Sequence, residues 1–308
     1  MKMKKLILLG VMIAMDIAMM AGCVSGTAVG TTEKEVTPVF NDDGIEIFAP
    51  KKLLVQDSPE KGGRLVHKTY YSKIAEKQKG INVLLPPGYS EEKKYPVLYV
   101  LHGIFGDENT MVGTSVLFAN MINSGLSKEM IVVYPFMYTS RTQNQCNAID
   151  KKNIEAYDNF IDEMTSSIMP FISENFPVLE GRENTAITGF SMGGREALAC
   201  AFYRQELFGY VGSVAPAPGL VPSKDIHMSH EGQFMESELV FSAGKPKPEL
   251  VMLCCGDIDS VVGMFPAKYH GIMNENRTEH LWWLVPGSDH GDPAISSGFY
   301  NFAQRIFK

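Results

Sequence analysis

Residues 187–194 read ITGFSMGG, an apolar run that gives way to a serine placed between glycines. The residues before this serine (NTAIT) favour a strand, and the residues after it (MGGREALACAFYRQ) favour a helix. The motif Gly189-x-Ser191-x-Gly193 in this setting is typical of a nucleophile elbow, a tight strand-to-helix turn that displays a serine hydroxyl. An ordinary glycine-rich loop is the alternative interpretation, and the rest of the chain must distinguish the two.

Short apolar runs and longer amphipathic segments alternate from about residue 40 onward. The runs are continuous, which indicates strands buried on both faces, as in a mainly parallel sheet. Residues 155–176 carry apolar side chains at intervals of three and four, which predicts a helix, and Pro170 is expected to kink it near its end. This alternation predicts an α/β fold with helices on both faces of the sheet. The expected strands lie within residues 80–89, 95–103, 130–136, 184–190, 249–256 and 280–287.

Functional residues of such a fold lie in loops at the carboxyl ends of the strands. A nucleophilic serine needs a base, and His290 lies in a loop directly after the apolar run HLWWLV. The base needs a carboxylate to orient it, and Asp257 and Asp259 both follow the run ELVMLCC. Either aspartate gives the order serine, aspartate, histidine of α/β-hydrolases, and spacing alone does not choose between the two.

The oxyanion that forms during acyl transfer needs two preplaced N–H donors. The backbone of Met192, which follows the serine, is expected to supply one of them. Ile104 in the stretch YVLHGIFGDE is the candidate for the other, because glycines at positions 103 and 106 let the backbone turn inward. His102 is expected to be a structural residue that braces this loop. Exposed positions are expected for the other histidines, which are His67, His227, His230, His270 and His280.

Four motifs of the chain resemble the esterase D superfamily and, within it, the feruloyl and acetylxylan esterases of carbohydrate esterase family 1. They are LLPPGYSEEKKYPVLYVLHGIFGDEN, GFSMGG, CCGDIDSVVG and WWLVPGSDHG, and they occur in the family's order. The resemblance implies one α/β-hydrolase domain over residues 41–308, without a large lid, a cofactor or a metal. It also maps the triad carboxylate to Asp259, the base to His290, and the oxyanion donors to the amides of Ile104 and Met192.

Acyl esters of plant cell-wall polysaccharide are the substrates that the resemblance implies. Residues 216–248 are polar and irregular, and they are expected to form a loop that borders the acyl pocket. Phe105, Pro218 and Leu220 are candidates for an apolar slot that holds a ferulate ring, and packing is the alternative for each. Phe105 stands where the family commonly has a second glycine, so the resemblance does not define this side of the pocket.

The first 22 residues have the layout of a secretory signal, with a positive MKMKK, a short apolar run and small residues before Cys23. This ending resembles the lipobox of bacterial lipoproteins, so Cys23 is expected to be lipidated. Simple secretion is the alternative, and a transmembrane anchor is disfavoured because the apolar run is short and contains Asp16. Residues 23–40 are then expected to form a flexible tether. The protein is expected to be exported, either lipid-anchored at a bacterial cell surface or in the periplasm, or secreted.

The formal net charge is −7 and no basic block follows the N-terminal segment, which argues against nucleic acid as a partner. The four cysteines after Cys23 are expected to be mostly buried thiols, because cysteine in an apolar segment usually acts as a small core residue. Their spacing and surroundings suggest no metal site. A membrane is expected as a partner only through the lipid anchor at Cys23.

An exported serine esterase that releases hydroxycinnamic acids from feruloylated xylan, through an acyl-enzyme on Ser191, is therefore the leading prediction. An acetylxylan esterase or another small-acyl esterase is the first alternative. A hydrolase of S-formylglutathione is disfavoured by the export signal, and an acyltransferase would use the same acyl-enzyme. A surface protein that binds carbohydrate without catalysis is the alternative of another class. It would have no use for Ser191, Asp259 and His290 together.

Overall fold

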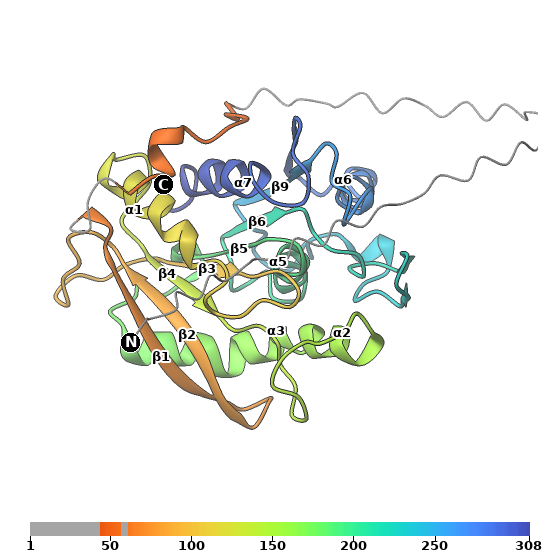
Figure 1. Ribbon diagram of the computed structural model, residues 1–308, viewed down its shortest axis with the longest axis horizontal. Coiled ribbons are helices and arrows are strands. Elements are labelled where there is room, and N and C mark those ends of the chain that lie inside the picture. Colours follow the sequence, from red (N-terminus) through yellow and green to blue (C-terminus); the bar gives the residue numbers. More distant parts are fainter. Residues whose placement is uncertain (1–43, 57–60) are drawn as a thin grey trace, which may run out of the picture. The chain divides into compact units, whose positions relative to one another are not determined.

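The computed structural model describes residues 44–56 and 61–308 (Figure 1). The expected signal segment 1–22 and the expected tether 23–40, with Cys23, lie outside the described residues. Within the described part, no helix combines the length and the apolar character that crossing a membrane requires.

A mainly parallel sheet of eight strands forms the centre of the fold (Figure 1). The strand order is β1-β2-β4-β3-β5-β6-β9-β10. β2 pairs antiparallel with β1 and with β4, whereas the other neighbouring strands of this sheet are parallel. The strands are β1 (Arg64–Ser72), β2 (Lys77–Leu85), β3 (Val97–Leu101), β4 (Ile131–Pro135), β5 (Thr185–Gly189), β6 (Tyr210–Val214), β9 (Leu250–Gly256) and β10 (Leu281–Val285). β7 (Ser223–Lys224) and β8 (Ser229–His230) form a separate antiparallel ribbon.

Helices cover both faces of the sheet, as the sequence predicts (Figure 1). α1 and α7 lie together on one face, where the rings of Phe118 and Phe299 pack with their centroids 6.0 Å apart. α5 lies against β3, β5 and β6, and α2 and α3 pack against α5. The helices are α1 (Ser115–Asn123), α2 (Lys151–Asp158), α3 (Phe160–Glu163), α4 (Met169–Asn175), α5 (Met192–Tyr203), α6 (Phe265–Glu275) and α7 (Ala294–Ala303).

Two adjacent tryptophans on β10 show which helices cover which face. Successive residues of a strand point to opposite faces. Trp282 stacks on His270 of α6 with ring centroids 5.0 Å apart, whereas Trp283 donates a hydrogen bond of 3.0 Å from Nε1 to Ser297 Oγ of α7. α6 and α7 therefore cover opposite faces of the sheet.

The helix that the sequence predicts over residues 155–176 forms as three α-helical segments and one π-helical turn. α2 and α3 come first, the π-helical turn spans Met164–Ile168, and α4 follows. Pro170 lies in the first turn of α4, directly after the π-helical turn, and the backbone is helical on both sides of this junction. A proline inside a helical run removes a backbone hydrogen bond, and a π-helical turn beside it is a usual site of local irregularity. The apolar stripe faces the core, because Tyr157 and Phe160 are completely buried.

Buried, free thiols are what the sequence predicts for the cysteines after Cys23, and the described residues confirm it. Cys200 lies on α5, and Cys254 and Cys255 lie on β9. The four free and buried cysteines of the described part are Cys146, Cys200, Cys254 and Cys255.

The direction in which strands are added reverses at β3, since β4 lies on one side of β3 and β5 on the other. At such a point the carboxyl ends of two parallel strands open a crevice in which ligands bind. β3 leads into residues 102–106 and β5 leads into Ser191. The loop with the expected oxyanion donor and the loop with the candidate nucleophile therefore meet at this crevice.

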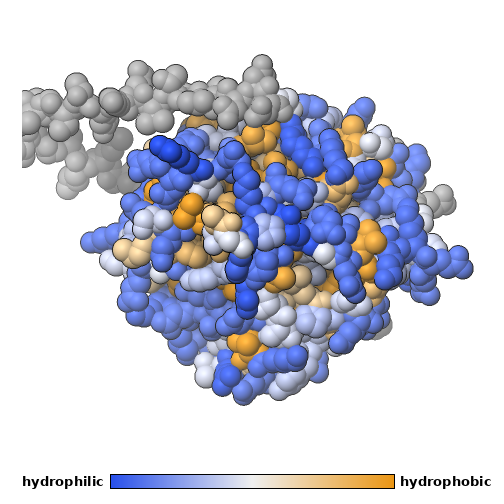
Figure 2. Space-filling view, turned by 180° about the vertical axis from the view of Figure 1, so that it is seen from behind, coloured by the Kyte–Doolittle hydropathy of each residue, from blue (hydrophilic) through white to orange (hydrophobic). Residues whose placement is uncertain are grey.

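Hydrophobic side chains on the face turned away from the first view lie in small groups among hydrophilic ones (Figure 2). Scattered apolar residues of this kind are ordinary on the surface of a folded protein.

Candidate active site

Ser191 lies in a strained turn between β5 and α5. Its backbone φ is 58° and its ψ is −118°, a conformation that a residue with a Cβ rarely adopts. Hydrogen bonds hold the turn on both sides of the serine. Its amide donates to Val214 O (2.9 Å), and its carbonyl accepts from the amide of Ala217 (3.1 Å). The chain thus has the backbone geometry of a nucleophile elbow at this position.

The glycines on both sides of Ser191 are required by close backbone packing. A Cβ placed on Gly189 would lie 2.4 Å from the backbone carbonyl of Gly193. A Cβ placed on Gly193 would lie 2.4 Å from Leu101 O at the end of β3. Any side chain at either position would therefore force the elbow away from the central strands, which explains the G-x-S-x-G pattern in physical terms.

Ser191, His290 and Asp259 lie in one hydrogen-bonded row. Ser191 Oγ lies 2.9 Å from His290 Nε2, and His290 Nδ1 lies 2.8 Å from Asp259 Oδ2. The carboxylate is nearly inaccessible, with 1% of its side chain exposed, whereas the imidazole is 14% exposed. An imidazole so placed can take the serine proton at Nε2 while the carboxylate keeps the ring proton on Nδ1.

The two candidate aspartates occupy different positions. Asp259 Oδ1 accepts the amides of residues 261–262 (3.0 and 2.9 Å), which leaves Oδ2 for His290. Asp257 is exposed, and its Oδ1 accepts the amide of Gly287 at 2.7 Å. Asp259 is therefore the carboxylate in contact with the imidazole.

The loop that carries His290 is held on both sides of the imidazole. Asp289 Oδ1 accepts the amide of Ser260 (2.7 Å) and the amide of His290 (2.8 Å). These hydrogen bonds, first of all those from Ser260, hold the pKa of Asp289 below its ordinary value. The ring of Phe190 lies against the imidazole, with the two centroids 4.5 Å apart. These contacts restrict the positions that the imidazole can take.

The amides of Ile104 and Met192 are free to act as donors. Across residues 44–56 and 61–308, no hydrogen bond from either amide is present. Met192 is the first residue of α5, where N–H groups have no partner within the helix. A Cβ placed on Gly103 would lie 3.4 Å from Ser191 Cβ, so the loop after β3 lies directly beside the serine. This arrangement fits an oxyanion site between two backbone amides.

Residues 103–106 have the features of a type II turn. The amide of Gly106 donates to Gly103 O at 3.2 Å, and Phe105, the third residue, has a φ of 65°. A type II turn requires a positive φ at its third residue, which favours glycine. The glycine that the resemblance predicts there thus has a conformational reason. Phe105 adopts the same backbone conformation at a cost of about 1 kcal/mol.

His102 braces this turn, in agreement with the structural role that the sequence predicts. Its side chain is buried, its Nδ1 lies 2.7 Å from Gly103 O, and its Nε2 accepts the amide of Met137 at 3.0 Å. Tyr157 is a second buried side chain at the turn, because its hydroxyl accepts the amide of Phe105 at 3.2 Å. In the sequence, Tyr157 is only one of the regularly spaced apolar side chains of residues 155–176. This spacing does not reveal where the tyrosine hydroxyl lies.

The three residues expected to line the acyl pocket differ in exposure. Phe105 is 55% exposed beside the oxyanion loop, and Pro218 is half-buried. Leu220 is completely buried, so the expectation that it lines an open slot is wrong. Its side chain belongs to the hydrophobic core instead, which is the packing alternative.

Among the other histidines, His67 and His227 are exposed, as predicted. His230 is not, because it is 7% exposed and its Nε2 lies 2.7 Å from a carboxylate oxygen of Asp225. His270 and His280 are half-buried, with Nδ1 of the first 2.8 Å from Nε2 of the second. In the described part of the chain, no group of three or more His, Cys, Asp or Glu side chains is placed to hold a metal ion.

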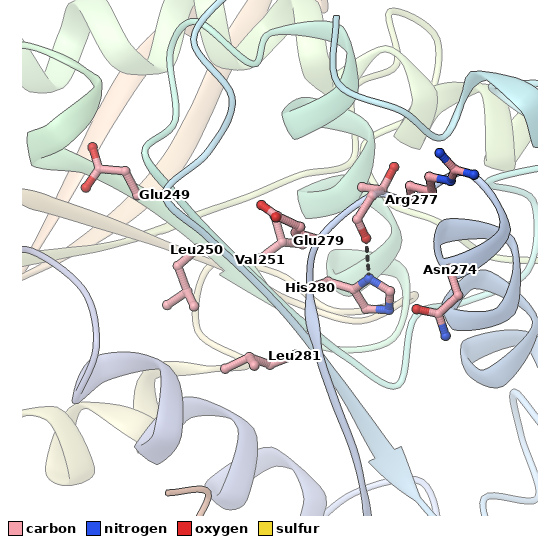
Figure 3. A pocket seen from close by; sticks show the side chains of 9 residues that line it. Glu249, Leu250, Val251, Asn274, Arg277, Glu279, His280 and Leu281 are labelled. Atoms are coloured by element: carbon pink, nitrogen blue, oxygen red, sulfur yellow. Dashed lines mark hydrogen bonds between the residues drawn. The ribbon is translucent and has the colours of Figure 1, made fainter. Parts of the chain in front are cut away.

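A surface pocket of about 570 Å³ lies at the amino ends of β9 and β10 (Figure 3). Residues 250–251 and 281, at the start of β9 and β10, line it together with Arg277 and His280. His290, which contacts Ser191, follows the carboxyl end of β10, and Asp259, which contacts His290, follows the carboxyl end of β9. This pocket is therefore separate from the hydrogen-bonded row.

Comparison with known sequences places the chain among esterases. A family model described as "Putative esterase" matches residues 72–287. An endo-1,4-beta-xylanase/feruloyl esterase of Xylanibacter ruminicola is 30% identical over 224 residues, which are 61% of this chain and 30% of that protein. The chain thus spans less than a third of the length of this curated relative.

Solved structures of the same architecture include esterases with bound hydroxycinnamic acids. A CE1 ferulic acid esterase of Anaeromyces mucronatus, in complex with ferulic acid, is 41% identical with a TM-score of 0.81. The match covers 85% of this chain and 97% of that one. A mutant feruloyl esterase module from Clostridium thermocellum, complexed with sinapinate, is 18% identical with a TM-score of 0.66 over 84% of this chain and 93% of that one, a likeness of fold alone. The predicted fold class is thereby confirmed.

Proposed function

Because the chain belongs to carbohydrate esterase family 1, a family of serine carboxylic ester hydrolases with the α/β-hydrolase fold, we propose that it is a feruloyl esterase. Its proposed reaction releases hydroxycinnamic acids from plant cell-wall xylan. The observation that carries the proposal is the likeness, over nearly the whole of a 41% identical structure, to a ferulic acid esterase that holds ferulic acid. The contacts among Ser191, His290 and Asp259 support a serine-based mechanism.

In the proposed reaction, Ser191 Oγ attacks the ester carbonyl carbon while His290 Nε2 takes the hydroxyl proton. The carbonyl oxygen becomes an oxyanion, to which the amides of Ile104 and Met192 donate. When the ester C–O bond breaks, His290 gives the proton to the departing sugar oxygen, and the acyl group stays on Ser191. A water then attacks this ester and gives its proton to His290, and the bond to Ser191 Oγ breaks as the serine regains a proton.

Asp259 has two roles in this scheme. Its hydrogen bond to Nδ1 keeps the ring proton on that nitrogen, so that Nε2 is free to accept the serine proton. Its negative charge then stabilises the imidazolium that forms. The two backbone amides of residues 261–262 that hold Oδ1 support this assignment, because they fix the carboxylate in place.

The experiment that tests the substrate assignment compares methyl ferulate with acetylated xylan, each incubated with residues 24–308. Release of ferulate that disappears in a Ser191→Ala variant is the expected result. Release of acetate alone would keep Ser191 as the nucleophile and assign the protein to the small-acyl esterases. Binding of xylan without hydrolysis of any ester would favour the non-catalytic carbohydrate-binding alternative.

Phe105 is proposed to form part of the wall that contacts the ferulate ring. We expect Phe105→Gly to raise KM for methyl ferulate about fivefold, because one aromatic contact contributes about 1 kcal/mol. Glycine tolerates the φ of 65°, so the turn and its amides are retained. Steady-state kinetics on methyl ferulate and on p-nitrophenyl acetate measure the effect. Equal KM values for methyl ferulate in the two proteins would remove Phe105 from the acyl pocket, and p-nitrophenyl acetate serves as the control ester.

Export and lipidation of Cys23 are also part of the proposal, supported by the signal-like residues 1–22. Expression in a bacterium with a labelled fatty acid is expected to label the full chain and to leave a Cys23→Ser variant unlabelled. Label on both proteins, or on neither, would contradict lipidation at Cys23. Unlabelled protein in the medium would support simple secretion instead.

A further inference from the structure

The peptide group between Gly103 and Ile104 is held through its carbonyl. His102 Nδ1 lies 2.7 Å from Gly103 O, and the amide of Gly106 donates to the same oxygen. A trans peptide group is planar, so its C=O and its N–H point in opposite directions. Any group that fixes the carbonyl of Gly103 therefore also fixes the direction of the Ile104 N–H.

The tautomer of His102 is set by a second hydrogen bond. Because the amide of Met137 donates to Nε2 at 3.0 Å, that nitrogen carries no proton in the neutral ring. The proton then lies on Nδ1, where it is donated to Gly103 O. Burial lowers the pKa of His102 to about 4, so the ring stays neutral above that pH. The imidazole thus acts as a fixed donor toward the turn.

The next peptide group, between Ile104 and Phe105, is held through its N–H. The amide of Phe105 donates to the Tyr157 hydroxyl at 3.2 Å. Type I and type II turns differ by a flip of this central peptide group, so a fixed acceptor for its N–H favours one of the two. Tyr157 is completely buried on α2, and its ring packs against Tyr138 with centroids 5.5 Å apart, which keeps the hydroxyl in place.

We infer that His102 and Tyr157 are positioning residues that hold the peptide groups on both sides of Ile104, so that its N–H points at the oxyanion. This inference rests on the proposed acyl-enzyme reaction and adds two residues to it. Both act through the backbone of the turn. Their loss therefore weakens stabilisation of the transition state and leaves binding of the acyl group intact.

Tyr157→Phe is the first test, because it removes one oxygen atom and keeps the ring. We expect kcat for p-nitrophenyl acetate to fall about tenfold with KM within about twofold, as for loss of one buried hydrogen bond. Affinity for phenylboronic acid, which forms a tetrahedral adduct with a reactive serine, is expected to fall in parallel. Affinity for ferulate, measured as competitive inhibition, is expected to stay the same.

Substitutions at position 102 give the second test. His102→Leu is expected to lower kcat by about 100-fold, the effect of losing one oxyanion donor. His102→Asn is expected to have a kcat about tenfold higher than that of His102→Leu, because the asparagine side-chain N–H can still be donated to Gly103 O. Recovery by the asparagine would not follow if His102 served only to fill space in the core.

Tyr138→Phe is the matched control, since Tyr138 is also buried and its hydroxyl donates to Asn153 Oδ1 at 2.6 Å, away from the turn. We expect this variant to keep kcat and boronate affinity. Unchanged kcat and boronate affinity in Tyr157→Phe, or equal losses in Tyr157→Phe and Tyr138→Phe, would overturn the inference. A wild-type protein that hydrolyses no ester would instead refute the proposed function, and this inference with it.

Discussion

Replacing Ser191 with alanine is expected to lower kcat for methyl ferulate about a millionfold, the effect of removing the nucleophile from a serine hydrolase. The physical reason is that no other hydroxyl of the elbow can form the acyl-enzyme. Alanine keeps the Cβ and the backbone of the turn, so the protein is expected to unfold at nearly the same temperature as the wild type. Enzyme assays and thermal unfolding measure the two quantities separately.

His290→Ala is expected to have an effect of similar size, because a serine hydroxyl without a base is a poor nucleophile. The double variant Ser191→Ala/His290→Ala is expected to be no slower than either single one, since the two residues act as a unit. Ser124→Ala, on an exposed serine after α1, is the control and is expected to keep full activity. An active Ser191→Ala protein would contradict the assignment of the nucleophile.

Asp259→Asn is expected to lower kcat about ten-thousandfold. An asparagine at this position can turn its NH₂ group toward the imidazole, which then keeps its proton on Nε2 and can no longer accept the proton of Ser191. The hydrogen bond of 2.8 Å between Asp259 Oδ2 and His290 Nδ1 is the observation behind this expectation. Steady-state kinetics on methyl ferulate give the size of the loss.

Asp257→Asn is the matched control, two residues away on the same loop. Asp257 accepts a hydrogen bond from Gly287 N, and the oxygen of an asparagine can accept it equally well. We expect kcat to change by less than about threefold, since the side chain does not contact the imidazole. A loss as large as that of Asp259→Asn would remove the basis for choosing between the two aspartates.

Buried strands were predictable from the sequence because they are continuous apolar runs, as at residues 97–101 and 131–135. β1 was not, because most of its residues are exposed and its pattern is polar, as expected of an edge strand. β6 was missed because Gly212 and Ser213 interrupt its apolar run. These two small or polar residues accommodate Phe302 of α7 and the carbonyl of Gly194 of α5, contacts that only the assembled fold defines.

The candidate site was predictable where chemistry restricts the residue type and strand order restricts the position. Ser191 lies between glycines that the backbone requires, and His290 follows a strand end, so these two residues could be named from the sequence pattern. The pattern left Asp257 and Asp259 as alternatives after the same strand, and only the family resemblance selected Asp259. Leu220 and Tyr157 show the limit of this reasoning. An apolar residue in a polar loop can face the core, and a tyrosine in an apolar stripe can place its hydroxyl on a distant turn, because both outcomes depend on packing between elements far apart in the chain.

Trapping of the acyl-enzyme tests the central claim most directly. Protein mixed with excess methyl ferulate is quenched in acid within the first turnovers, and the intact chain and its proteolytic peptides are weighed by mass spectrometry. The account predicts one added feruloyl group on the peptide that contains Ser191 and none in the Ser191→Ala variant. A feruloyl group on another residue would contradict it. Ferulate release by the wild-type protein would also contradict it if neither the wild type nor the slower Asp259→Asn variant carried an acyl group on Ser191.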